Sequence, residues 1–275
     1  MTGASGFATT LDGRTQLHWE ATGAGEPVLL IMGLGLSGGA WWRTVPVLAR
    51  QLRVITFDNR GVGRSRAFSY AYTTDAMADD AATVLNAVGV ERAHVYGISL
   101  GGMVAQAFAL RHPERVRSLV LGATSPGGPR AVRPAAEVTA FFRRRPQMAA
   151  EEAARESVPF NYGPRCRAEH VDRIEEDIAQ RLRHPFSARA YRAQLFAAAW
   201  HNALGSLGRI AAPTLVVHGA LDRVIPVGNA QLIAERIPGA RVRIFEGAGH
   251  LYPTEEPSAD REIARFLVGR REAAA

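Results

Sequence analysis

The sequence of 275 residues predicts an α/β fold, in which a mostly parallel, doubly wound sheet has helices on both faces and carries an inserted helical cap. Continuous apolar runs bounded by Gly or Pro are typical of strands buried on both faces. Such runs occur at residues 28–32, 54–57, 93–98, 116–122, 213–219 and 242–247. Helical apolar spacing separates them, at residues 41–52, 75–88, 100–112, 227–237 and 258–268. Ahead of the first run, residues 7–22 should form an antiparallel edge hairpin around Asp12 and Gly13.

The alternation of strands and helices is interrupted once. It stops near Ser125 and resumes near Ala212, and the stretch between them has helical spacing broken by several prolines. A helix-rich, strand-poor segment inside an α/β pattern indicates an insertion. We therefore expect a cap at residues 127–212, placed between two parts of an α/β body at residues 1–126 and 213–275.

Composition bounds the kind of protein. With 47% hydrophobic and 21% charged residues, the chain has enough apolar surface to fold as a globular protein, which excludes intrinsic disorder. Cys166 is the one cysteine, so the chain forms no internal disulfide and offers no cysteine cage for a metal. The N-terminal residues lack a signal-peptide pattern, and no run of about 18 apolar residues occurs. We expect a cytoplasmic protein without a membrane span.

All 33 basic residues are arginines. A chain without lysine has neither a Schiff-base amine nor a P-loop lysine, which excludes mechanisms that need either group. We attribute the excess to biased codon usage and expect no nucleic-acid partner, because the run Arg143 to Arg145 has no aromatic platform beyond Phe141 and Phe142. The cap holds 14 arginines against 9 acidic residues, which is either a solvated helical surface or a field that attracts acidic substrates.

The strongest local motif is Gly97-Ile98-Ser99-Leu100-Gly101-Gly102, between a predicted strand and a predicted helix. A strand followed at once by a helix forces a sharp turn at Ser99, and the flanking glycines let backbones approach where a Cβ atom would collide. The start of the helix also brings backbone N–H groups beside the serine. Ser99 is therefore the candidate nucleophile.

A serine hydroxyl needs a base, and the base needs an orienting acid. His250 follows the last predicted strand and Asp222 follows the strand before it, so both should emerge at the carboxyl edge of the sheet, beside Ser99. The order Ser, Asp, His matches one of the three common triad orders. The alternative for Asp222 is a turn residue that caps the following helix. His218, inside a predicted strand, is interpreted as a core histidine.

These motifs, together with the loops Met32–Gly35 and Asp58–Ser65, make the chain resemble the α/β-hydrolase superfamily over almost its whole length, and within it the small esterases, enol-lactonases and polyketide methylesterases. The resemblance implies an α/β-hydrolase fold and an oxyanion hole formed by the backbone N–H groups of Leu34 and Leu100. It also implies that loop 58–65 supports the oxyanion loop. Many relatives have His-Gly where this chain has Met32-Gly33, which removes the polar support that the histidine would give.

The predicted activity is hydrolysis of a carboxylic ester or lactone of a medium-sized, partly hydrophobic small molecule, through a Ser-His-Asp triad and an acyl-enzyme, without a cofactor or metal. Carbon–carbon bond hydrolysis or perhydrolysis on the same triad is the alternative, and a non-catalytic ligand-binding protein is the alternative from another class. The sequence indicates no oligomeric state. The residues expected to line the substrate pocket are Leu36, Trp41, Trp42, Met103, Phe141, Phe142, Phe160, Trp200 and Leu251.

Overall fold

A computed structural model describes residues 3–68, 72–184 and 186–269 of the chain. Within these residues, nine strands form one sheet in the order β1-β2-β4-β3-β6-β7-β8-β9, with β5 paired to β2. The six strands from β4 to β9 along this order pair in parallel, whereas β1, β2 and β5 form antiparallel pairs. The strands are β1 (Ala4–Thr9), β2 (Thr15–Thr22), β3 (Glu26–Ile31), β4 (Leu52–Phe57), β5 (Arg66–Ala67), β6 (Ala93–Ile98), β7 (Val116–Gly122), β8 (Thr214–Gly219) and β9 (Arg241–Phe245). The predicted mostly parallel α/β fold is confirmed.

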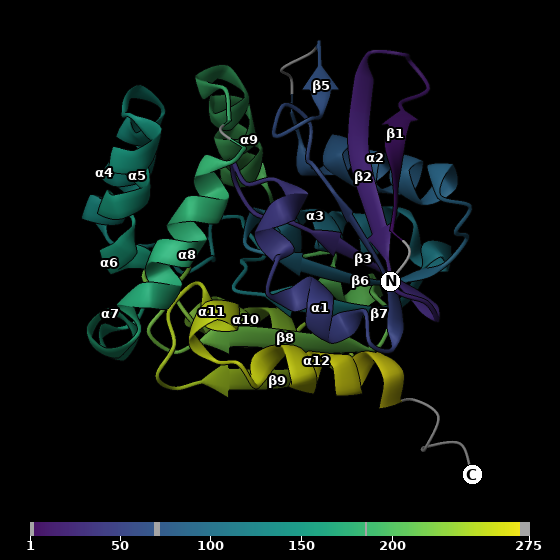
Figure 1. Cartoon of the computed structure of the whole chain (residues 1–275). Helices are drawn as coiled ribbons and strands as arrows, with labels where there is room; N and C mark the ends of the chain where they lie inside the picture. The colour runs from purple at the N-terminus through teal and green to yellow at the C-terminus, as the bar shows by residue number, and fades with distance from the viewer. Residues whose placement is uncertain (1–2, 69–71, 185, 270–275) are drawn as a thin grey trace.

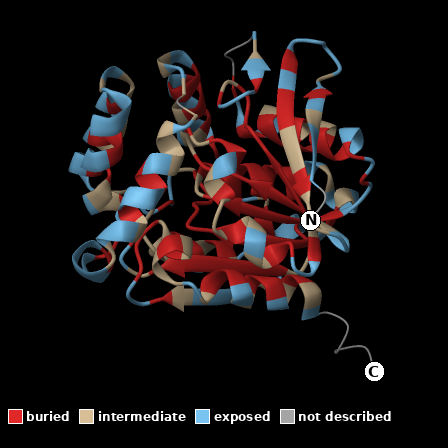
Figure 2. Cartoon of the chain, in the orientation of Figure 1, coloured by how far each residue is buried: buried red, intermediate tan, exposed pale blue. Residues whose placement is uncertain are grey.

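Helices cover both faces of this sheet. On one face lie α2 (Thr74–Ala87), α3 (Leu100–Arg111) and α10 (Gly228–Ala234), and on the other lie α1 (Thr44–Leu48) and α12 (Ala259–Val268). The apolar run of β3 is continuous because both of its faces are covered by helices. Leu29 packs on the face of α2, α3 and α10, and Leu30 packs on the face of α1 and α12. Figure 2 shows the buried strands running between helices whose outer faces are exposed.

Two shorter elements differ from the expected pattern. In place of the helix expected at 41–52, the structure has a 3₁₀ turn, η1 (Gly38–Trp41), followed by the short α1. The expected range also ended too late, since Leu52 already belongs to β4. The short helix α11 (Tyr252–Glu255) follows the loop after β9. Two further 3₁₀ turns, η2 (Pro113–Arg115) and η4 (Leu207–Arg209), lead into β7 and β8.

Between β7 and β8 the described residues form helices and no strand. Figure 1 shows these helices gathered at one end of the molecule, toward which β8 and β9 point. They are α4 (Ala136–Arg144), η3 (Arg145–Gln147), α5 (Ala150–Glu156), α6 (Val158–Asn161), α7 (Pro164–Glu169), α8 (Val171–Leu182) and α9 (Ala188–Trp200). No helix in the described part of the chain is long and apolar enough to cross a membrane.

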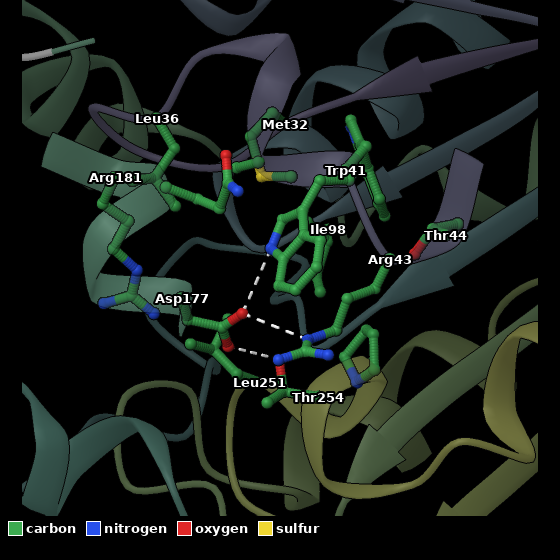
Figure 3. A pocket seen from close by; sticks show the side chains of 14 residues that line it. Met32, Leu36, Trp41, Arg43, Thr44, Ile98, Asp177, Arg181, Leu251 and Thr254 are labelled. Carbon is green, nitrogen blue, oxygen red and sulfur yellow. Dashed lines mark hydrogen bonds and ion pairs between the residues drawn. The ribbon is translucent and has the colours of Figure 1, made fainter. Parts of the chain in front are cut away.

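Asp177 of α8 ties the cap to the body. Its Oδ1 atom accepts hydrogen bonds from Trp42 Nε1 at 3.2 Å and from Arg43 Nε at 3.3 Å. Its Oδ2 atom accepts from the Tyr162 hydroxyl at 3.0 Å and from the Thr254 hydroxyl at 2.5 Å. Figure 3 shows this carboxylate at the wall of a small cavity of about 50 Å³. Four donors from three segments satisfy one buried carboxylate, and the three donors that belong to the body, Trp42, Arg43 and Thr254, fix α8 against it.

Glu255 of α11 makes a second link between the cap and the body. Its two carboxylate oxygens accept backbone N–H bonds from Gly163 in the cap and from Gly249 beside His250, each at 2.7 Å. Burial raises the pKa of Glu255 to about 7, although both N–H groups oppose that shift. The loop that carries His250 is therefore fixed to a cap segment through a carboxyl group that titrates near neutral pH.

A buried ion pair joins the loop after β4 to α2. Arg60 Nε and Nη2 contact the two carboxylate oxygens of Asp80 at 2.6 and 2.7 Å. Removing one partner of such a pair leaves the other charge buried and uncompensated. Asp80→Asn should therefore lower the free energy of unfolding by about 3 kcal/mol in urea titrations. Glu262→Gln, which removes the same charge from the more exposed pair with Arg243, should cost less than about 1 kcal/mol. Equal losses would contradict this account of the Asp80 pair.

The Glu255 carboxyl predicts a specific pH dependence of stability. Because its pKa is about 7 in the folded chain and 4.5 ordinarily, its contribution is fully present below pH 4.5 and is lost as pH rises through 7. Between pH 5 and 8, wild type should lose about 2 kcal/mol more unfolding free energy than Glu255→Gln. Urea titrations at both pH values measure this difference, and Glu246→Gln, on the exposed surface, should behave as wild type. Parallel pH profiles of wild type and Glu255→Gln would refute it.

Candidate active site

Ser99 lies at the turn between β6 and α3, in a backbone conformation that few side-chain-bearing residues adopt. Its φ and ψ angles are 58° and −124°. A Cβ atom on Gly97 would collide with the backbone of Gly101, and one on Gly101 would collide with the Ile31 carbonyl. The two glycines therefore let strand and helix meet closely enough to hold this turn, at which the serine is strained.

A cavity of about 520 Å³ surrounds this serine. Ser99 and His250 both line it, together with residues of the loop after β3, of the cap segment before α4, and of α4, α8 and α9. Cap and body thus enclose one cavity at the carboxyl edge of the parallel strands, the place where α/β folds usually bind small molecules.

Asp222 and His250 come together as the sequence predicts. Asp222 Oδ2 lies 2.8 Å from His250 Nδ1, and Asp222 Oδ1 accepts the backbone N–H groups of Val224 and Ile225 at 2.8 Å each. Burial would raise the pKa of the Asp222 carboxyl, but His250 and His218 beside it hold that pKa below its ordinary value. The carboxylate is thus ionised, buried and aimed at one ring nitrogen of His250.

His218 contacts the same carboxylate. Its Nε2 atom lies 3.1 Å from Asp222 Oδ2 and 2.8 Å from the Ile225 carbonyl oxygen. A carbonyl only accepts, so Nε2 carries the hydrogen that faces both oxygens. His218 is fully buried, as expected for a core histidine, and it also supports Asp222. Its spacing of four residues before Asp222 is the signal that could have indicated this contact.

Ser99 and His250 share the cavity without touching through a hydrogen bond. Within the described residues, the Ser99 hydroxyl forms no hydrogen bond with the His250 ring or any other group. In substrate-free sites such contacts are often long and tighten only when substrate binds. The structure therefore places Ser99 and His250 on the wall of one cavity, with Asp222 bonded to the histidine, and leaves the Ser99 hydroxyl without a hydrogen bond among the described residues.

Leu34 and Leu100, whose backbone N–H groups are the expected oxyanion donors, also line this cavity. Neither donates a hydrogen bond to any residue that the structure describes, so both are available to an incoming oxygen. The loop that carries Leu34 is held from two sides: Asn59 Nδ2 donates to the Met32 carbonyl at 2.8 Å, and Gln194 of α9 accepts from Gly35 N at 2.9 Å. Side-chain contacts thus replace the support that a histidine before Gly33 would give.

Asp58 adds to this support. Its carboxylate accepts the backbone N–H groups of Gly38 and Arg64 at 2.8 Å each, which joins the loop after β4 to the loop after β3. Loop 58–65 therefore contacts the loop that carries Leu34, while Arg60 and Arg64 form ion pairs with Asp80 and Glu20.

The expected pocket residues divide into three groups. Leu36, Met103, Phe142 and Leu251 line the cavity around Ser99. Trp41 and Trp42 line the small neighbouring cavity of Figure 3, which shares Leu36 and Leu251 with the larger one. The remaining three, Phe141, Phe160 and Trp200, are not among the residues that line the cavity around Ser99.

The positions of these three aromatic residues have simple physical reasons. Phe141 is fully buried because it packs on the rings of Phe142 and Phe160, at 5.4 and 5.2 Å between centroids. Trp200 ends α9 with 73% of its surface exposed, beside Phe196. Helical spacing fixes which residues share a face but not which face meets the cavity.

Two arginines that the sequence analysis did not assign to the pocket, Arg145 and Arg181, also line the cavity. Arg145 ends a run of three arginines and Arg181 lies on an amphipathic helix, and neither pattern separates these residues from surface charges. No group of three or more His, Cys, Asp or Glu side chains within the described ranges is arranged to hold a metal ion.

Comparison with known proteins agrees with this architecture. The family model described as alpha/beta hydrolase fold matches residues 26–257. A 2-hydroxymuconate semialdehyde hydrolase of a Pseudomonas species is 32% identical over 278 aligned residues, covering 95% of this chain and 93% of that protein. A pimeloyl-[acyl-carrier protein] methyl ester esterase of Aeromonas hydrophila is 34% identical over 260 residues, covering 91% and 98%.

Among solved structures, a hydrolase from Pseudomonas aeruginosa is 30% identical and superposes with a TM-score of 0.84, covering 98% of this chain and 100% of that one. The family model spans most of the chain, and the relatives match it over nearly their whole length. The chain therefore belongs to the α/β-hydrolase fold family.

Proposed function

We propose that this protein is a serine hydrolase that cleaves a carboxylic ester or lactone of a medium-sized, partly hydrophobic small molecule through an acyl-enzyme. One observation carries the proposal. One cavity is lined by a strained serine, by a histidine bonded to a buried carboxylate, and by two residues whose backbone N–H groups have no partner among the described residues. Acyl transfer needs a nucleophile, a base and an oxyanion site together, and this cavity offers all three.

In the first half of the proposed reaction, His250 Nε2 takes the proton of the Ser99 hydroxyl as Oγ attacks the substrate carbonyl carbon. The carbonyl oxygen gains a negative charge, which the N–H groups of Leu34 and Leu100 receive. Such fixed donors are typically worth about 3 kcal/mol each in the transition state. His250 then gives its proton to the leaving alkoxide, and the bond between carbon and that oxygen breaks.

In the second half, a water molecule takes the place of the alcohol. His250 Nε2 accepts one water proton as the hydroxide oxygen attacks the acyl carbon, and the same two N–H groups hold the second oxyanion. The carbon–Oγ bond breaks, Ser99 recovers its proton from His250, and the carboxylic acid leaves. A lactone follows the same steps, except that the alcohol and the acid remain in one molecule.

Asp222 acts through His250. Its Oδ2 atom accepts from Nδ1, which keeps the Nε2 lone pair free for the serine and stabilises the imidazolium that forms. The hydrogen bond from His218 and the two backbone N–H bonds hold the carboxylate ionised and fixed in direction. Four donors on one buried carboxylate leave it a single orientation toward the histidine.

Hydrolysis of a carbon–carbon bond beside a carbonyl is the second candidate, which the similarity to the 2-hydroxymuconate semialdehyde hydrolase favours. It would use the same serine and histidine, but the leaving group would be a carbanion that the site must protonate. Mass spectrometry of the products separates the candidates, because ester cleavage releases an alcohol and carbon–carbon cleavage releases a group terminated by a C–H bond.

Ser99→Ala and His250→Ala should each reduce kcat/KM for a p-nitrophenyl acyl series by about 10⁴-fold or more, because triad residues act as a unit. Steady-state kinetics measure the loss, and thermal unfolding of each variant shows that the fold is kept. Ser125→Ala, which removes another serine hydroxyl from the same cavity, should retain most of the activity. Wild-type rates in Ser99→Ala or His250→Ala would show that the site is misassigned.

Asp222→Asn should reduce kcat by about 10³- to 10⁴-fold while leaving KM nearly unchanged, since an amide group at this position favours the wrong imidazole tautomer. Val224 and Ile225 can still donate to the remaining oxygen, so the loop should keep its conformation. Asp172→Asn, on the exposed side of α8, is the matched control. A loss of less than about tenfold in Asp222→Asn would argue that another group orients His250.

A further inference from the structure

The charged side chains that line the cavity around Ser99 are all basic. Four arginines are among the residues that line it, and no aspartate or glutamate is among them. Two of the four, Arg133 and Arg143, are exposed, while Arg145 is buried and Arg181 is half-buried. A cavity with cationic groups and no lining carboxylate has a positive potential, which low-dielectric walls strengthen.

Arg145 is the exceptional member of this set. It is 9% exposed, its Nε atom is buried without a hydrogen-bond partner, and no carboxylate in the described residues forms an ion pair with it. Burial lowers the pKa of its guanidinium, and the nearby charge of Arg181 acts in the same direction, whereas the Tyr191 hydroxyl opposes the shift. A buried charge without a counter-charge destabilises a fold. An arginine kept in this state inside a cavity indicates that an anion from outside completes its environment.

Aromatic rings hold the Arg145 guanidinium in place. It lies over the rings of Phe186 and Tyr191, at 5.3 Å from each centroid. The Tyr191 hydroxyl is buried beside the guanidinium and is a neutral group, so it supplies no counter-charge. The ring of Tyr191 also rests against Gly35, where a Cβ atom would lie 2.8 Å from it. The guanidinium is therefore fixed by the same packing that positions the loop of Leu34.

Arg181 of α8 is oriented by neutral groups. Its Nη2 atom donates to the Tyr162 hydroxyl at 3.0 Å and its Nη1 atom to the Ser157 hydroxyl at 3.4 Å. The Tyr162 hydroxyl in turn donates a hydrogen bond to Asp177, whose oxygens also accept from other donors. Arg181, labelled in Figure 3, thus lines both cavities with its charge uncompensated by an ion pair among the described side chains.

We propose that Arg145, with Arg181 beside it, binds a carboxylate of the substrate, so that the preferred substrates are esters or lactones of acids that carry a second, ionised carboxyl group. This inference rests on the proposed hydrolysis at Ser99. A guanidinium matches a carboxylate through two parallel N–H bonds, and one buried cation balances its single charge. Apolar lining residues such as Phe142, Leu195 and Ala198 suit the carbon chain that joins the two carboxyl carbons.

Two esters of equal chain length test the proposal. One is p-nitrophenyl hexanoate and the other is the mono-p-nitrophenyl ester of hexanedioic acid, which differs by a terminal carboxylate. Wild type should hydrolyse the acidic ester with kcat/KM at least about tenfold higher, mainly through a lower KM. In Arg145→Met, which keeps an unbranched side chain on the two rings, this ratio should fall to about one.

Controls separate binding at Arg145 from a general field. Arg144→Met removes the same charge from the neighbouring surface position, where it pairs with Glu156, and should keep the wild-type ratio. The wild-type ratio should also persist in 0.5 M NaCl, because a buried pair is screened less than surface charges. A matching ester with a terminal phosphonate should be a poorer substrate than the carboxylate ester.

The outcomes distinguish this inference from the proposed function. If wild type hydrolyses neither ester, the hydrolase proposal fails. If it hydrolyses the neutral ester equally well, or if Arg145→Met keeps the preference, the carboxylate site is refuted while the hydrolase remains. If Arg144→Met or salt abolishes the preference, a diffuse field explains it instead, and if the phosphonate ester is preferred, the anion is not a carboxylate. Thermal unfolding of Arg145→Met verifies that the variant is folded.

Discussion

The candidate active site depends on one close approach of backbones, at the turn between β6 and α3, which packs against the end of β3. Without glycine at 97 and 101 the strand, the helix and the neighbouring strand could not meet, because side chains would occupy the space that backbone atoms now fill. The approach forces Ser99 into its strained conformation and directs it out of the sheet. It also fixes the N–H group of Leu100 before any charge develops, so no reorganisation is needed when an oxyanion forms.

The cap contributes to this geometry as well as closing the cavity. Gln194 holds the loop of Leu34, Glu255 joins Gly163 to the residue before His250, and Asp177 fixes α8 against Trp42 and Arg43. Gln194 and Asp177 are cap residues that bond to the body, and Glu255 is a body residue that bonds to both parts. A substrate that changed the position of the cap would therefore act on the catalytic loops through these bonds, and the charged cavity wall belongs to the same elements.

Much of the body could be predicted from the sequence, because physical rules connect pattern to place. Apolar runs buried on both faces indicated the parallel strands, and loops after parallel strands lie at one edge, which brought Ser99, Asp222 and His250 together. The cap was less predictable. Helical spacing identifies a helix but leaves open which neighbour its apolar face meets, so Phe141 packs on other rings and Trp200 faces outward. Arg145 has no carboxylate partner among the described residues, and this depends on how distant parts of the chain pack together, which a sequence pattern does not show.

The central claim is that Ser99, His250 and the N–H groups of Leu34 and Leu100 form one acyl-transfer site. A crystal structure of the protein after reaction with an alkyl p-nitrophenyl phosphonate tests this most directly. The account predicts phosphorus bonded to Ser99 Oγ, with one phosphoryl oxygen about 3 Å from both backbone nitrogens and His250 Nε2 facing the remaining oxygen. Phosphorus bonded to another residue, or a phosphoryl oxygen out of reach of both N–H groups, would contradict it.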